Sequence, residues 1–252
     1  MKFLIFDTDR SLATIGGKED ILRATGGIPH LPISGGVMQI KEVLDRLWVK
    51  SIVEERHELL DIVFRDEVYT PTPAGNQLGL DGIVLDTVSF LFAQDKRILE
   101  DKSGGGQLEQ RDWGKLERYY TSLFQALSGL PAWVIVNAHI KYDKDSEKGV
   151  FVWGPQVQGQ TFGNLPKYFD CVFYTKTAIA PTTKERLFSW QTAPDIGKNA
   201  KDRKDLMKEN FIPMDHGVVI KKYQDAGIPY PKILIIGDSG SGKTKALTTI
   251  NK

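Results

Sequence analysis

The stretch Gly237-Asp238-Ser239-Gly240-Ser241-Gly242-Lys243-Thr244 decides how this sequence is interpreted. It fits the pattern G-x-x-x-x-G-K-[ST] of a phosphate-binding loop, the P-loop. The apolar run Ile233–Ile236 precedes it and predicts a buried strand. A P-loop normally opens its domain, yet this one lies close to the last residue, Lys252. We therefore expect the rest of the domain either to be missing or to lie at the other end of the chain.

The residues of this motif have distinct chemical roles. Its glycines let backbone N–H groups curve around phosphate oxygens without a clash from Cβ atoms. The helix that follows directs its positive end toward the same anion. We expect Lys243 to reach the β- and γ-phosphates of ATP, and Thr244 to place its hydroxyl on Mg²⁺. A chance glycine turn is the alternative, but the preceding strand and the complete G-K-T ending favour a nucleotide site.

Composition narrows the possible classes of protein. The chain has 252 residues, of which 41% are hydrophobic and 26% charged, which is ordinary for a globular α/β protein. With a net charge of +1, a nucleic-acid site must be a local feature of the surface. The single cysteine, Cys171, excludes an internal disulfide framework and a zinc site built from cysteines. The apolar run Phe3–Phe6 is too short for a signal peptide, so we expect a cytoplasmic protein without a membrane span.

Apolar periodicity predicts strands alternating with helices, and hence a mostly parallel central sheet flanked by helices. The predicted strands are residues 3–6, 83–85, 133–136, 171–174, 187–190, 218–220 and 233–236. Helical spacing is found from about 37 to 63 and from 113 to 127. Two polar segments rich in glycine, residues 96–110 and 141–163, are predicted to be loops.

Two acidic residues are candidates for the catalytic side of the nucleotide site. Asp86 ends the apolar run 83–85, which we expect to lie next to the P-loop strand, and would hold Mg²⁺ together with Thr244. Asp9 follows the strand 3–6 and would orient or deprotonate the attacking water, with Asp7 as the alternative. For each residue the alternative is an aspartate that only satisfies local backbone N–H groups.

Two further groups of polar residues are weaker candidates. Asn137 and His139 follow the strand 133–136 and are placed to sense the γ-phosphate by hydrogen bonding, although a lone histidine is often structural. Lys198, Lys201 and Arg203 form a basic cluster that either clamps a phosphate or lies on a solvated face.

These segments resemble the core of RecA-type ATPases, in particular the small phage-encoded branch associated with single-strand annealing. If Lys252 is joined to Met1, the sequence reads KILIIGDSGSGKTKALTTINK followed by MKFLIFDTD. This gives a strand, a P-loop, a short helix and a strand that ends in D-T-D, which resembles the opening of that family. Five later segments resemble further family motifs in the same order: I-V-L-D-T, R-D-W-G-K-L, V-N-A-H, L-P-K-Y-F-D and N-A-K-D-R.

The resemblance implies a circular permutation. Residues 1–252 would form one RecA-like domain whose original ends are joined near 226–231, and the two present termini would lie close in space. The family's late K-x-R motif corresponds to Lys201 and Arg203, which would act on the nucleotide within one chain or across a subunit interface. The chain departs from RecA at the water-activating position, where Asp9 replaces a glutamate and has a shorter reach.

The resemblance also implies a function. We expect an ATPase that uses Mg²⁺ and ATP, forms a homo-oligomeric ring or filament, and acts on single-stranded DNA in recombination or annealing, in the cytoplasm of a bacterial host. The two polar segments carry candidate DNA contacts: Lys96, Arg97, Lys102, Lys141, Lys144 and Lys148, with Tyr142, Phe151 and Trp153 for stacking. The alternatives are a P-loop kinase acting on a small molecule and a nucleotide-gated binding module with little turnover.

Overall fold

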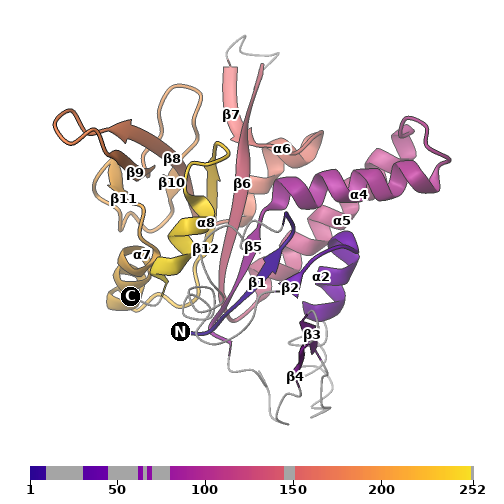
Figure 1. Cartoon of the computed structure of the whole chain (residues 1–252), viewed down its shortest axis with the longest axis horizontal. Helices are drawn as coiled ribbons and strands as arrows, with labels where there is room; N and C mark the ends of the chain where they lie inside the picture. Colours follow the sequence, from indigo (N-terminus) through magenta and orange to yellow (C-terminus); the bar gives the residue numbers. More distant parts are fainter. Residues whose placement is uncertain (10–30, 45–61, 65–66, 70–79, 145–150, 251–252) are drawn as a thin grey trace.

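The apolar runs of the sequence form the centre of one ten-stranded sheet in the computed structural model (Figure 1). The structure describes residues 1–9, 31–44, 62–64, 67–69, 80–144 and 151–250. Eight strands follow one another across the sheet in the order β11, β9, β8, β12, β6, β5, β1, β2, while β10 pairs with β8 and β7 with β6. A strand from the end of the chain, β12, therefore lies in the middle of the sheet.

The strands of this sheet are as follows: β1 Phe3–Asp7, β2 Leu31–Pro32, β5 Gly82–Asp86, β6 Trp133–Lys144, β7 Phe151–Pro155, β8 Cys171–Ile179, β9 Arg186–Gln191, β10 Lys201–Asp202, β11 Phe211–Pro213 and β12 Lys232–Gly237. The central pairs, from β8 through β12, β6, β5 and β1 to β2, are all parallel. The pairs made by β7, β9, β10 and β11 are antiparallel. The predicted mostly parallel sheet is thus confirmed at its centre. A separate hairpin joins β3, Ile62–Phe64, to β4, Glu67–Tyr69.

Helices cover both faces of the sheet because the central strands are apolar on both faces. Three helices pack on one face: α2 (Gly36–Leu44), α4 (Val88–Lys102) and α5 (Gln110–Gly129). The other face is covered by α7 (His216–Asp225), α8 (Lys243–Ala246) and the 3-10 helix η4 (Leu247–Thr249). The short helices α6 (Gln160–Asn164) and η3 (Leu165–Tyr168) connect β7 to β8. All six residues of β12 are buried, as expected for a central strand between two helical layers.

Three of the sequence predictions about secondary structure are wrong. The run 218–220 is helical, because Val219, Ile220 and Tyr223 share one buried face and Asp215 caps the first turn by accepting from the Gly217 N–H at 2.8 Å. Residues 96–102 continue α4, so only the second half of the segment 96–110 forms the predicted loop. Of the predicted helix 37–63, residues 37–44 are helical in α2 and residues 62–63 belong to the strand β3; positions 45–61 lie outside the described residues.

The segment 141–163 is also different from the predicted loop. The strand β6 continues through Lys144, and β7 pairs with it from Phe151 to Pro155. The resulting hairpin extends beyond the edge of the sheet at which the parallel strands end (Figure 1). Alternating aromatic and charged side chains such as Tyr142 and Asp143 are compatible with a two-stranded ribbon, a pattern that the glycine and charge content of the segment concealed.

A buried carboxyl group, Asp95 of α4, joins three helices and makes stability depend on pH. It accepts hydrogen bonds from the Val37 N–H at 3.1 Å and the Tyr120 hydroxyl at 2.7 Å. Burial raises the pKa of Asp95 from 3.8 to about 6, against the opposing effect of these hydrogen bonds. Between these two values the folded state holds a proton that the unfolded state has released. The free energy of unfolding is therefore expected to fall as pH rises through this range, by up to about 1.4 kcal/mol per pH unit.

The test is urea unfolding of the wild type and of Asp95→Asn across the same pH range. The asparagine keeps the size of the side chain and does not titrate, so its unfolding curve is expected to lose this part of the pH dependence. The same pH dependence in both proteins would show that another group is responsible.

Candidate nucleotide site

Polar residues of three parallel strands meet at the carboxyl edge of the sheet. The register of β1, β5 and β6 places Asp7 beside Asp86, and Asp86 beside Asn137. Two residues further along β6, His139 is paired with Gly237, the first residue of the P-loop. Residues from three separate parts of the sequence are thus brought to the place where ligand sites form in open α/β sheets.

The P-loop connects β12 to α8 with the backbone conformation that its glycines permit. Gly240 and Gly242 have φ angles of +73° and +84°, in the left-handed region that favours glycine. Gly237 is required for a different reason, because a Cβ atom there would collide with the Thr175 hydroxyl of β8. The loop therefore passes so close to the neighbouring strand that a side chain at its first position would displace it.

Lys243 begins α8 and folds back over the loop. Its ammonium group donates to the carbonyl oxygens of Gly237 and Asp238, both at 2.8 Å. Only 4% of the residue is exposed. Burial lowers the pKa of Lys243 to about 8, while the carboxylates of Asp86, Asp238 and Asp9 oppose this shift. The ammonium thus lies inside the loop, among acidic groups, in a place where a phosphate would be a better partner than two neutral carbonyls.

This pKa predicts that nucleotide affinity depends on pH. A bound polyphosphate favours the charged ammonium, so the pKa of Lys243 in the complex must be higher than in the free protein. Above about pH 8 the free protein binds only after taking up a proton, and the affinity is expected to fall up to about tenfold per pH unit. Titration with a fluorescent ATP analogue, one unit below and one unit above this pH, measures the effect. Equal affinities at the two pH values would contradict it.

Asp86 is fully buried at the end of β5 and accepts a hydrogen bond from the Asn137 amide at 2.9 Å. It also acts electrostatically on Lys243, so it lies within reach of the P-loop although it is distant in sequence. A buried carboxylate and the hydroxyl of Thr244 are oxygen ligands of the kind that Mg²⁺ uses in nucleotide sites. The residues present therefore fit an Mg²⁺–ATP complex.

The strand that carries Asp86 was expected to lie next to the P-loop strand, and this expectation is wrong. The strand β6 lies between β5 and β12 and pairs in parallel with both. Apolar strand sequences such as 83–85 and 133–136 fit either position, so the sequence did not distinguish them. Asn137 lies on the intervening strand β6 and donates a hydrogen bond to Asp86 of β5.

His139 lies between the P-loop and the core. Its backbone N–H donates to the Ser89 hydroxyl at 3.0 Å, and its ring contacts Phe90 edge-on at 5.5 Å. Burial lowers the pKa of His139, Lys243 lowers it further, and Asp9 and Asp238 oppose the shift. Within the described part of the chain, its Nε2 atom is buried and has no hydrogen-bond partner. A neutral imidazole with an unused nitrogen beside Lys243 is suited to a hydrogen bond with a phosphate oxygen.

Asp9 and Asp7 have different surroundings. Asp9 acts on both Lys243 and His139, which places its carboxylate among the groups that surround the P-loop. Asp7 is 1% exposed and lies in register with Asp86 inside the sheet. Asp9, which is partly exposed, is therefore better placed to meet a water molecule.

Two residues of the basic cluster, Lys201 and Arg203, are not brought to the P-loop of the same chain. Lys201 is paired with Val172 at the start of β8, and Arg203 lies 3.6 Å from the Asp170 carboxylate. Because Cys171 of β8 pairs with Ile233, this end of β8 is four residues, roughly 13 Å, before Gly237. Lys198 lies over the rings of Trp153 and Tyr174, at 5.8 and 5.7 Å from their centroids.

Sequence reasoning missed several residues that position this site. Ser89 and Gln156 both bind the backbone of His139, the second through its N–H to the His139 carbonyl at 2.6 Å. Thr8 holds the Asp86–Thr87 segment, because its hydroxyl accepts from the Thr87 N–H and donates to the Thr87 carbonyl, both at 2.8 Å. The D-T repeats at positions 7–8 and 86–87 are the one sequence signal that pointed to this pairing.

A family model described as an AAA domain matches residues 1–204. The chain belongs to this AAA-domain family. The match identifies an ATPase domain of the P-loop class, which binds nucleotide. The matched residues include Asp86, Asn137 and His139, while the P-loop follows the matched region. No curated protein and no solved structure matches the chain.

Among the residues that the structure describes, none of the helices is both long and apolar enough to cross a membrane.

Proposed function

We propose that this AAA-domain protein is a circularly permuted, RecA-like ATPase that binds and hydrolyses ATP with Mg²⁺ and acts on single-stranded DNA in recombination or annealing. The observation that carries the ATPase proposal is the environment of Lys243. A buried P-loop lysine is acted on electrostatically by Asp86, the last residue of β5, and by Asp9, which follows β1 of the same sheet. This arrangement supplies the phosphate cradle, the ligands for the metal and a candidate for activating water.

The topology supports the permutation. If the domain began at Lys232, the P-loop strand β12 would be its first strand and β1 would follow the P-loop helix. Both strands belong to the same sheet and run in parallel with the strands between them. Met1 packs against the cluster that contains Ile250, the last described residue.

Restoring the proposed order tests the permutation directly. A chain that starts at Lys232, runs through Lys252 into Met1 and ends near Ala226 should fold and bind ATP like the parent. A rearranged chain that fails to fold or to bind nucleotide would contradict the permutation, while leaving the ATPase assignment of the parent intact.

The proposed reaction assigns one role to each residue of this chain. Lys243 exchanges its carbonyl partners for the β- and γ-phosphates and stabilises the charge that develops during transfer. Asp9 orients the attacking water and accepts its proton while the bond from phosphorus to the bridging oxygen breaks. Asn137 holds the Asp86 carboxylate, and His139 offers Nε2 to the γ-phosphate. Thr244 and Asp86 would hold Mg²⁺, which neutralises phosphate charge when bound.

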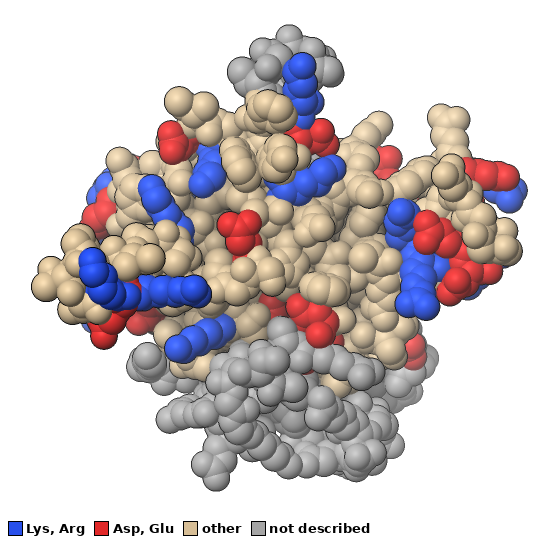
Figure 2. Space-filling view, turned by 45° about the horizontal axis from the view of Figure 1, so that its top comes forward, with Lys and Arg blue, Asp and Glu red and all other residues tan. Residues whose placement is uncertain are grey.

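The β6–β7 hairpin is the proposed DNA contact. Tyr142 and Phe151 are 59% and 57% exposed, and Tyr142 packs against both Phe151 and Trp153. Aromatic faces of this kind stack on bases regardless of sequence. Among the other proposed contacts, Lys144 lies on the hairpin, Lys96, Arg97 and Lys102 lie on α4, and Lys148 falls outside the described residues. Figure 2 shows basic and acidic residues interspersed over the face that it displays, so DNA binding must rest on local contacts.

ATP turnover with and without single-stranded DNA, over a series of salt concentrations, tests the function. Stimulation by DNA that weakens with increasing salt is expected, because phosphate contacts release counterions. Phosphate transfer to a small acceptor without any response to DNA would favour a kinase. Nucleotide binding without turnover would favour a gated binding module.

In the proposed function, Lys201 and Arg203 contact the nucleotide bound by a neighbouring subunit of an oligomer. Lys201 and Arg203 lie away from the P-loop of their own chain, so any contact with a nucleotide would be with the one bound by a neighbouring copy. We therefore place them at the interface of a homo-oligomeric ring or filament. Loss of turnover in Arg203→Ala, restored partly by mixing with Lys243→Ala subunits, would support this placement; failure of the mixture to recover any turnover would contradict it.

A further inference from the structure

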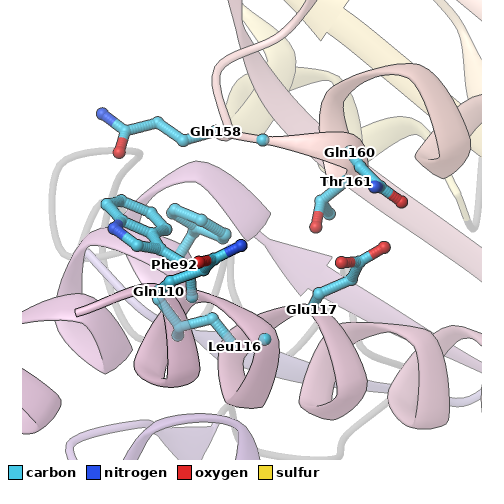
Figure 3. Close-up of a pocket in the computed structure, with 10 residues that line it drawn as sticks. Phe92, Gln110, Leu116, Glu117, Gln158, Gln160 and Thr161 are labelled. Carbon is cyan, nitrogen blue, oxygen red and sulfur yellow. The ribbon is translucent and has the colours of Figure 1, made fainter. Parts of the chain in front are cut away.

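We propose that a cavity between α5 and the segment 158–161 binds one base of a single-stranded nucleic acid and prefers bases that carry an exocyclic amino group. This inference rests on the proposed DNA-binding function and adds a second, recessed contact to the hairpin. The cavity has a volume of about 350 Å³, at the small end of the usual range for ligand pockets. Figure 3 shows it between α5 below and the segment from Gln158 to Thr161 above.

The cavity is separate from the nucleotide site. Its floor is made by Phe92 of α4 and Leu116 of α5, which belong to the core cluster on one face of the sheet. The P-loop helix α8 packs on the opposite face. A ligand in this cavity would therefore be bound at the same time as a nucleotide at Lys243.

The lining combines aromatic surface with polar groups that have no assigned role. Phe92 and Trp113 supply the aromatic surface. Gln110, Glu117, Gln158 and Thr161 bring amide, carboxyl and hydroxyl groups to the cavity. Among the described residues, the side chains of Thr161, which is only 7% exposed, and of the half-buried Glu117 have no hydrogen-bond or ion-pair partner, whereas Gln110 and Gln158 are exposed at the mouth of the cavity. In Figure 3 the Glu117 carboxylate faces Thr161 across the cavity, and the Gln110 side chain extends beside Phe92.

The charge of the lining selects a base and excludes a phosphate. Glu117 is the one charged residue that lines the described cavity, and its carboxylate would repel an anion. The Lys96 ammonium lies 5.8 Å from the centre of the Trp113 ring and is close to the Glu100 carboxylate, outside the lining. A nucleotide unit fits this distribution if its base enters and its phosphate stays outside near Lys96.

The polar groups also indicate which base. Glutamine amides bind base edges that present a donor beside an acceptor, and a glutamate accepts from the amino group of cytosine. Thymine has no exocyclic amino group and presents a carbonyl oxygen where cytosine has the amino group. That oxygen would face the Glu117 carboxylate. Cytosine and adenine should therefore bind better than thymine.

The cavity is connected to the nucleotide site through two short segments. The Gln156 N–H donates to the His139 carbonyl, and Val157 is buried in the core, so the segment that forms one wall is fixed to the strand carrying His139. On the other side, α4 begins at Val88, two residues after Asp86, and supplies Phe92. A base bound in the cavity would therefore contact both the wall segment that is fixed to the His139 strand and the helix α4 that begins next to Asp86.

The test measures anisotropy of fluorescent oligo(dC) and oligo(dT) of equal length with the full chain at low salt and neutral pH. Wild type is expected to bind oligo(dC) about tenfold more tightly than oligo(dT), as one base-edge contact allows. Glu117→Gln should remove this preference, because its amide can donate to the thymine oxygen. The matched control Glu185→Gln, an equal change of charge on the β8–β9 connection, should keep it. Trp113→Ala should weaken both oligonucleotides about tenfold, the effect of one stacked base.

The outcomes separate the inference from the function on which it rests. If both oligonucleotides bind equally and the Glu117 and Trp113 variants bind like wild type, while Tyr142→Ala weakens binding, the cavity is not a base site and the hairpin proposal stands. If no oligonucleotide binds, the DNA function fails and the inference fails with it. Competition by cytidine at the same concentration as the oligonucleotide would overturn the single-strand assignment in favour of a free nucleoside. Thermal unfolding of each variant verifies that it is folded.

Discussion

Lys243→Ala is expected to abolish measurable ATP hydrolysis and to weaken ATP binding by roughly 10- to 100-fold. The affinity estimate follows from the loss of hydrogen bonds to a charged group, worth about 1.5–3 kcal/mol. Loss of a donor that stabilises charge in the transition state lowers turnover by a further factor of about 100 to 1,000. The substitution also leaves the Gly237 and Asp238 carbonyl oxygens without the ammonium that they now accept from. Turnover and nucleotide titration measure the two effects separately.

Lys245→Ala is the matched control for this variant. Lys245 lies on the same short helix, two residues further along, and is exposed. Removing it changes the net charge equally but touches neither the loop nor the acidic groups. ATP should raise the melting temperature of wild type and Lys245→Ala, because a ligand that binds only the folded state stabilises it, and should raise that of Lys243→Ala much less at the same ATP concentration. Equal shifts in all three proteins would mean that the nucleotide binds elsewhere.

The central strands could be predicted from the sequence because parallel strands buried on both faces are continuous apolar runs. Phe3–Phe6, Ile83–Leu85 and Ile233–Ile236 all became such strands. Their order in the sheet could not be predicted, because equally apolar strands are interchangeable until the connections between them are known. This is why Asp86 was expected beside the P-loop strand and is one strand further away.

The wrong predictions share a physical cause. Residues 96–102 form the last turns of α4. Most of their side chains are polar because they face solvent, while Leu99 is buried and holds this part of the helix against the protein core. Residues 218–220 are β-branched and apolar, but their burial against β12 and η4 outweighs their intrinsic preference for strands. The hairpin at 141–155 is a two-stranded ribbon whose mixture of charges and glycines is typical of a loop. In each segment, the secondary structure predicted from local composition was wrong because tertiary packing determines the structure.

Several residues of the candidate site could be proposed from the sequence because they follow strand ends. Asp9, Asp86 and His139 were predicted from that position and from the family motifs, and in the structure each of them interacts electrostatically with Lys243. Lys201 and Arg203 were predicted from their charge and from the resemblance to the K-x-R motif, and they lie at the other end of β8. The difference follows from topology: parallel strands bring their carboxyl ends together, whereas a basic run has no fixed place in a sheet.

Asp86→Asn is expected to reduce turnover by about 100-fold or more while leaving the fold intact, because removing one electrostatic contributor in a preorganised site has effects of this size. The asparagine keeps the shape of the buried side chain and can still accept the hydrogen bond from Asn137 through its amide oxygen. What it loses is the negative charge, so ATP binding should no longer depend strongly on Mg²⁺. A Mg²⁺ titration of ATP affinity in wild type and variant measures this loss.

The electrostatic role of Asp86 has a second, independent consequence. Its carboxylate opposes the effect of burial on Lys243, so its removal should lower the pKa of Lys243 further. The pH above which ATP affinity falls should therefore move below that of the wild type, a shift that a merely structural residue would not produce. Asp81→Asn is the matched control, because Asp81 immediately precedes β5 and binds the Lys2 N–H at 2.7 Å, at the opposite end of the strand. If Asp81→Asn and Asp86→Asn gave the same Mg²⁺ dependence and the same pH profile, Asp86 would have no special relation to the nucleotide.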